Sequence, residues 1–115
     1  MQYMLLIYHT EANRMPPKEE SAMLQEYMTF TQDIVKNGKF KAGDRLEPTA
    51  NATTVRVRNG KTATVDGPFA ETKEQLGGYY LVEAKDLDEA IPIAAKIPGA
   101  KHGSIEVRPV FQMNR

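Results

Sequence analysis

A helical pattern of apolar residues stands out between residues 18 and 37. The apolar side chains recur at three- and four-residue steps, which places them on one stripe of an amphipathic helix: Met23, Leu24, Tyr27, Met28, Phe30, Ile34 and Val35. Glu19 and Glu20 lie near its positive end, and Gly38 is a typical residue at which a helix ends. Because such a stripe must pack against another layer, the chain needs a sheet or further helices beside it.

Strand-like segments supply that second layer. Residues 3–8 form a near-continuous apolar run, which predicts a strand buried on both faces. Further strands are predicted over residues 39–46, 53–65, 77–84 and 104–112. A second helix follows a capping-box pattern at residues 86–89, and a start at Asp88 would place Pro92 within or just past its first turn.

The segment 53–65 is divided by Asn59-Gly60, the strongest local signal for a β-hairpin. A two-residue loop would place Arg58 opposite Lys61. A three-residue loop, with Gly60 in a bulge, would place four apolar residues on one face: Val55, Val57, Ala63 and Val65. We favour the three-residue loop, because it gives the hairpin a clean apolar side.

The order of elements is strand, helix, strand, hairpin, strand, helix, strand. This order predicts an α+β fold of the ferredoxin-like plait type, an antiparallel sheet with two helices on one face and an inserted β-hairpin. A length of 115 residues predicts a single domain over residues 1–115. Two helices cover only one face of such a sheet, so we expect a homodimer through the open sheet face with twofold symmetry.

The composition argues against several classes of function. Fifteen basic and fifteen acidic residues cancel, so we expect no nucleic-acid partner. No apolar run approaches the ~20 residues of a membrane-spanning helix, so we expect no membrane partner. The sequence has no cysteine, which excludes disulfides and thiolate metal sites and fits a cytoplasmic location.

Residues 66–80 resemble the motif of DGPF-type proteins in the YCII-related family. The motif opens with Asp66-Gly67-Pro68-Phe69. Further similar segments extend the resemblance over nearly the whole chain: residues 3–8, 43–46, 52–57, 87–90 and 103–109. The resemblance implies a dimeric ferredoxin-like fold of the α+β-barrel type. Some DGPF members are similar to proteins encoded beside alternative sigma factors.

The resemblance also bears on catalysis. In the wider family, a suspected enzymatic site rests on a histidine in the first helix and an aspartate after the second, and one branch is a dehydrochlorinase of a hydroxylated aromatic. This sequence has Tyr27 or Phe30 where that histidine would lie, and residues 97–99 read Ile-Pro-Gly where the aspartate would follow. Neither the dyad nor the dehydrochlorinase activity therefore carries over.

Asp66 and His102 are the candidate catalytic residues. Asp66 could act as a general base, or it could cap its own turn by accepting hydrogen bonds from backbone amides. His102 lies in a loop and could be a base, but both His102 and His9 could equally face solvent. The two histidines lack the spacing of a metal site, so no metal and no cofactor is expected.

Five further residues are candidates for substrate binding: Tyr8, Arg45, Glu71, Lys73 and Tyr80. Arg45 could hold a carboxylate or phosphate, or it could pair with a nearby acidic residue. Glu71 and Lys73 belong to a polar loop that is either a binding site or a solvated connection. Tyr79 and Tyr80 point to opposite faces of a sheet, so at most one of them lines a given cavity.

Two functions remain. The first is a small cofactor-independent enzyme acting on a small organic molecule. The second is a non-catalytic dimeric protein that binds a small-molecule ligand or has a regulatory accessory role. The enzyme hypothesis would be abandoned if Asp66, Arg45 and both histidines faced bulk water. The binding hypothesis predicts a pocket lined by tyrosine and methionine, with a fixed polar anchor and no acid–base pair.

Overall fold

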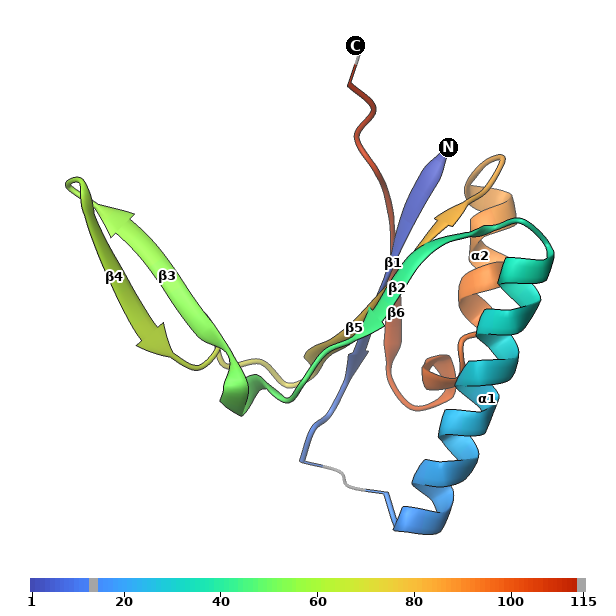
Figure 1. Cartoon of the computed structure of the whole chain (residues 1–115), viewed down its shortest axis with the longest axis horizontal. Helices are drawn as coiled ribbons and strands as arrows, with labels where there is room; N and C mark the ends of the chain where they lie inside the picture. The colour runs from blue at the N-terminus through green and yellow to red at the C-terminus, as the bar shows by residue number, and fades with distance from the viewer. Residues whose placement is uncertain (13–14, 114–115) are drawn as a thin grey trace.

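The computed structural model describes residues 1–12 and 15–113 and has an α+β architecture. A four-stranded antiparallel sheet has the order β2-β5-β1-β6. Its strands are β1 (Gln2–His9), β2 (Phe40–Arg45), β5 (Gln75–Glu83) and β6 (Ser104–Pro109). Helices α1 (Pro17–Lys36) and α2 (Leu87–Ala95) cover one face of this sheet (Figure 1). The arrangement is compatible with the predicted ferredoxin-like plait.

Local chemistry explains where the helices begin and end. Pro17 occupies the first position of α1, where the missing N–H group would have no helical partner, and Gly38 follows the end of the helix with a φ of 72°. The Asp86 carboxylate accepts a hydrogen bond from the Glu89 backbone N–H at 3.0 Å and caps α2. The cap starts α2 one residue earlier than predicted, at Leu87, so Pro92 lies inside the helix, in its second turn. Neither helix is long and apolar enough to cross a membrane, within the described residues.

The core lies between the sheet and the helices. Its buried members come from every layer: Tyr3, Leu5, Ile7, Phe30, Ile34, Tyr80, Val82, Ala84, Ala90, Ala94 and Ile97. Burial alternates along β1, since Leu5 is fully buried whereas Met4 and Leu6 are half-buried on the opposite face. The prediction that β1 is buried on both faces is therefore wrong for the single chain. Both faces of β1 are apolar, but the chain covers only one.

The open sheet face is the face without helices. Its centre is apolar and is formed by Met4, Leu6 and Leu81. Polar contacts flank this centre on both sides: Tyr79 Oη donates to Asp44 Oδ2 at 2.7 Å, and Tyr8 Oη donates to Glu106 Oε1 at 3.2 Å. The whole face thus has the composition of an interface, an apolar centre within a polar rim.

The inserted hairpin is a separate two-stranded sheet, formed by β3 (Thr53–Arg58) and β4 (Lys61–Asp66). We refer to residues 53–66 as the hairpin arm, because they extend away from the body (Figure 1). Arg58 lies opposite Lys61, so the loop has two residues, and the prediction of a three-residue loop is wrong. Asn59 and Gly60 have φ values of 54° and 75°, as a tight type I′ turn requires. Among the residues that the structure describes, no buried core residue belongs to the arm, so packing does not favour a register with one clean apolar side.

Gly43 makes room for the aromatic ring of Tyr80. A Cβ atom on Gly43 would lie 2.7 Å from Tyr80 Cδ1. The ring is held by an edge-to-face contact with Phe30, at a centroid distance of 5.1 Å, and by its hydroxyl, 2.6 Å from Thr31 Oγ1. Because the ring cannot move without losing these contacts, we expect Gly43→Ala to lower the free energy of unfolding by about 1–3 kcal/mol.

Urea denaturation measures this effect. Lys41→Ala, at an exposed position of the same strand, is the matched control and is expected to change stability by less than about 0.5 kcal/mol. A Gly43→Ala protein with the stability of the parent would contradict the close packing described here.

Candidate functional site

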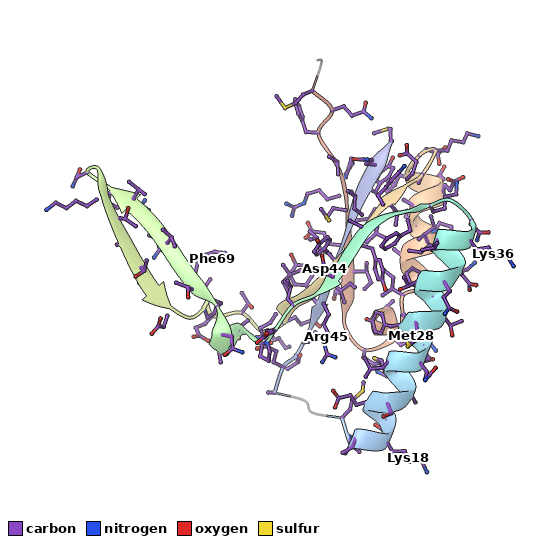
Figure 2. All side chains as sticks on the ribbon, in the orientation of Figure 1. Lys18, Met28, Lys36, Asp44, Arg45 and Phe69 are labelled. Carbon is purple, nitrogen blue, oxygen red and sulfur yellow. The ribbon has the colours of Figure 1, made fainter. Side chains whose placement is uncertain are left out.

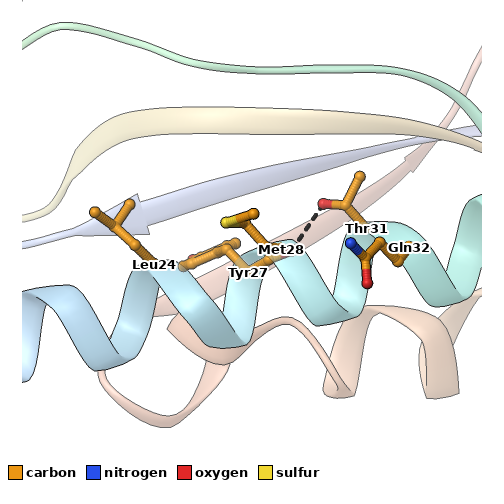
Figure 3. A pocket seen from close by; sticks show the side chains of 5 residues that line it. All are labelled: Leu24, Tyr27, Met28, Thr31 and Gln32. Atoms are coloured by element: carbon orange, nitrogen blue, oxygen red, sulfur yellow. Dashed lines mark hydrogen bonds between the residues drawn. The ribbon is translucent and has the colours of Figure 1, made fainter.

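A groove of about 460 Å³ runs along α1, and five side chains of that helix line it: Leu24, Tyr27, Met28, Thr31 and Gln32 (Figure 3). Most of its wall is apolar, and Leu24 and Met28 are exposed although they belong to the apolar stripe of the helix. The spacing explains this exposure. Leu24, Met28 and Gln32 follow one another at four-residue steps, on a line beside the buried pair Phe30 and Ile34.

Two tyrosine hydroxyls are fixed beside this groove. Thr31 Oγ1 donates to the Tyr27 carbonyl oxygen at 2.8 Å and lies 2.6 Å from Tyr80 Oη. The threonine hydroxyl has a single proton, so Tyr80 is the donor in the second bond. Tyr27 Oη accepts a hydrogen bond from the Gly99 backbone N–H at 3.1 Å. This bond ties α1 to the short 3₁₀ helix η2 (Pro98–Lys101).

Burial raises the pKa of Tyr27 and of Tyr80 above the ordinary value of tyrosine. Both phenols therefore keep their protons at neutral pH. A neutral phenol can donate a hydrogen bond to a ligand but is a poor proton acceptor. Because Tyr80 already donates its proton to Thr31, the phenol proton left for a ligand is that of Tyr27, and neither tyrosine is a general base.

Arg45 lies at the end of β2, on the same side of the sheet as α1, because its strand partner Gly78 belongs to the buried face. Its guanidinium Nη2 lies 3.8 Å from Glu20 Oε1, and its side chain is 72% exposed. Figure 2 shows Arg45 at the end of β2, across from Met28 on α1. A loose pair such as Arg45–Glu20 contributes little energy and leaves the cation available to an anionic ligand.

The structure therefore brings two of the predicted binding residues, Arg45 and Tyr80, to one place. Tyr27 and Thr31 were not among the predicted site residues. Tyr27 was assigned to the apolar stripe of the helix, and the hydroxyl of Thr31 at the edge of that stripe is the signal that could have marked the site.

The other predicted residues lie elsewhere. Asp66 is exposed at the base of the hairpin arm, and its carboxylate has no hydrogen bond within the described residues, to its own turn or to any other group. Glu71 and Lys73 are exposed in the loop between β4 and β5, and His102 is exposed at the end of η2. Tyr8 lies on the open sheet face, where burial and its bond to Glu106 raise its pKa.

His9 is also exposed, at the end of β1. Asp66, Arg45 and both histidines thus face solvent in the single chain. Among the described residues, no concave site unites the candidate acid–base groups.

The family model of the YCII-related domain matches residues 1–114. The chain belongs to the YCII-related family. It is also 39% identical over 114 residues to the uncharacterized protein R00369 of Rhizobium meliloti (strain 1021), and the match covers 96% of this chain and 92% of that relative.

The raised tyrosine pKa values make the stability of this YCII-related chain depend on pH. In the unfolded chain Tyr27 and Tyr80 lose their protons near pH 10, whereas the folded chain holds these protons more tightly. The stabilisation is complete below pH ~10 and is lost as the pH rises through the raised pKa values of the folded state. We expect the free energy of unfolding to fall between pH 8 and pH 11.

Denaturant titrations at both pH values measure this loss. Tyr27→Phe removes one of the titrating phenols, so the loss between pH 8 and pH 11 should be smaller in the variant, whatever its stability at pH 8. An equal loss in the variant and the parent would show that the Tyr27 hydroxyl is not held as described.

Proposed function

We propose that this YCII-related chain is a non-catalytic dimeric protein that binds a small organic anion in the groove along α1. The observation that carries this proposal is the composition of the groove. It combines an apolar wall with the hydroxyl groups of Tyr27 and Thr31, without an acid–base pair among its lining residues, and the exposed guanidinium of Arg45 lies on the same side of the sheet. A binding role of this kind is compatible with the regulatory accessory function that the DGPF resemblance suggests.

The chemistry of the groove favours a ligand with an apolar body and a carboxylate. The groove is open and is lined by side chains of one helix, so a ligand would lie along α1 with one side exposed. Leu24 and Met28 offer apolar contact, and methionine adapts to ligands of different shape. The planar fork of Arg45 matches the two oxygens of a carboxylate, and Glu20, its only ion-pair partner in the described residues, is displaced at little cost.

The dimer part of the proposal rests on the open sheet face. Met4, Leu6 and Leu81 form an apolar centre that none of the described helices or strands covers, and polar contacts flank it on both sides. A second copy of the same face, related by a twofold axis, would place one apolar centre against the other. This pairing would bury the face of β1 that the sequence makes apolar and the single chain leaves open.

The binding proposal is tested with matched pairs of an acid and its amide, benzoate with benzamide and hexanoate with hexanamide. We expect the acids, and not the amides, to raise the melting temperature and to give measurable heats of binding. Arg45→Ala should weaken binding of the acids about 10- to 100-fold, because a charge-assisted hydrogen-bond pair is lost. Arg56→Ala, which removes an exposed arginine of the hairpin arm, is the matched control.

Arg45→Lys separates two roles of the side chain. If Arg45 holds the carboxylate through a bidentate contact, Arg45→Lys should weaken acid binding nearly as much as Arg45→Ala does. If Arg45 contributes only its charge, Arg45→Lys should keep the affinity of the parent. Equal stabilisation by acids and amides, or by the parent and Arg45→Ala, would contradict the proposal. Conversion of either acid by the parent protein would contradict its non-catalytic part.

A further inference from the structure

The hairpin arm has an unusual place in this fold. Its Val55 and Val57 are each 59% exposed, and Val65 is 55% exposed. A two-stranded hairpin is marginally stable in water by itself, so apolar side chains in this position call for a packing partner. The radius of gyration is 16.3 Å, against about 13 Å for a compact chain of this length, which reflects the extension of the arm.

Hydrogen bonds between the two strand ends close the base of the arm. The Gly67 backbone N–H donates to the Ala52 carbonyl oxygen at 2.7 Å, and Thr54 Oγ1 donates to the Gly67 carbonyl oxygen at 2.9 Å. Asp66 and Gly67 open the DGPF motif, so the motif lies where the arm meets the body. The arm is therefore a defined projection with a closed base.

The direction of the arm indicates what it contacts. Figure 1 shows the helices on one side of the sheet and the arm leaving the body on the other side, the side of the open sheet face. Any body that covers the open sheet face must therefore lie beside the arm. The open sheet face and the arm form two sides of one continuous surface.

Charge favours a second copy of this chain as that body. The arm contains three basic residues, Arg56, Arg58 and Lys61, and one acidic residue, Asp66. The rest of the chain holds the remaining twelve basic and fourteen acidic residues. The net charges of the arm and of the rest of the chain therefore attract each other at long range between two copies, although the basic side chains lie on the arm face opposite to Val55 and Val57.

The size of the open sheet face points the same way. Four strands about 4.8 Å apart, with six to nine residues each, give a flat area of roughly 450 Å². A standard interface buries about 800 Å² on each partner. A dimer that used the sheet face alone would therefore be small, and the arm adds the missing apolar contact.

We infer that the arm of each copy packs against the body of a second copy and contributes Val55 and Val57 to the dimer interface. These two valines share one face of the arm, since their cross-strand partners are Thr64 and Thr62. The inference rests on the proposed dimer through the open sheet face and adds an exchanged element to it. The arms cross the twofold axis, so each chain holds its partner at two places.

The test is the full-length chain with Val55→Thr and Val57→Thr. Threonine keeps the β-branched shape that the strand favours and removes the apolar contact. Sedimentation equilibrium should give a dimer dissociation constant on the order of 100-fold higher than the parent, because four valines per dimer lose apolar burial. Leu87→Thr with Ile91→Thr, two exposed apolar residues of α2, is the control and should leave the dissociation constant unchanged.

A photo-crosslinking residue at position 57 gives a second readout that does not depend on the stability of the arm variant. We expect covalent pairs of two chains, with the crosslink joining the arm of one copy to the body of the other. Crosslinks confined to a single chain, a parent that remains monomeric, or an unchanged dissociation constant in the arm variant would each overturn the inference. Binding of benzoate and hexanoate depends on Arg45 and is measured separately on the arm variant. Loss of the dimer and loss of acid binding are therefore distinguishable, so failure of this inference is not mistaken for failure of the binding proposal.

Discussion

Gly103→Ala is expected to lower the free energy of unfolding by roughly 3 kcal/mol or more, because an added Cβ atom meets a closer obstacle there than at the other glycines. A Cβ atom on Gly103 would run into the Tyr8 carbonyl oxygen and crowd the backbone of His9. The obstacle is backbone and not the end of a flexible side chain. Tyr8 belongs to the central strand β1, which pairs with β6 from Tyr8↔Ser104 onward. Relief of the clash would therefore require a shift of one strand against the other.

Denaturant titration of the Gly103→Ala protein measures this cost. His102→Ala, at the exposed neighbouring position, is the matched control and should remain within about 0.5 kcal/mol of the parent. If Gly103→Ala folds as stably as its control, then β1 and β6 do not approach as closely as the structure describes. A variant that is too unstable to purify agrees with the expectation, provided that His102→Ala is obtained normally.

The features that the sequence predicted well are those decided by local chemistry. Helix α1 follows from its apolar stripe, and its end follows from Gly38. The cap of α2 follows from the spacing of Asp86 and Glu89, since a side chain three residues before a backbone N–H can satisfy it. The order of these elements is enough to anticipate an antiparallel sheet with two helices.

The features that the sequence did not predict depend on the three-dimensional surroundings of a residue. The three-residue loop of the hairpin was favoured because one apolar side suits a sheet that packs on a core. Among the described residues, no buried core residue belongs to the arm, and the turn conformation of Asn59 and Gly60 sets the register instead. Likewise, the apolar run of residues 3–8 indicates that both faces of the strand are apolar. It does not indicate which of the two faces the chain itself covers.

Only part of the candidate site was predicted, because the rest depends on the packing of a helix on the sheet. Arg45 and Tyr80 lie on two neighbouring strands that share a sheet face, and the residue pattern alone marked both. Tyr27 and Thr31 lie on the helix above them, where periodicity assigns side chains to the core. Only the packing of α1 over β5 places the hydroxyls of Thr31 and Tyr80 in contact and leaves Leu24 and Met28 exposed.

Leu81→Arg is expected to dissociate the proposed dimer, with a dissociation constant at least a thousandfold higher than that of the parent. Leu81 lies opposite Met4 on β1 and Ala42 on β2, at the apolar centre of the open sheet face. In a face-to-face dimer the arginine would be buried without a partner, and each dimer would contain two such charges. Removal of an unpaired charge from water costs several kcal/mol, which exceeds the ~4 kcal/mol of a thousandfold change. The single chain should still fold, because Leu81 is only half-buried within it.

Val35→Arg is the control for this prediction, since it adds the same charge at an exposed apolar position on α1, away from the open sheet face. Sedimentation velocity should show dimers for the parent and for Val35→Arg, and monomers for Leu81→Arg, with circular dichroism unchanged in all three. Because the open sheet face and the hairpin arm act on opposite sides of the same partner, Leu81→Arg should also abolish the crosslinks from position 57. A Leu81→Arg protein that remains dimeric would place the interface on another surface, and the arm would then have to be explained without the open sheet face.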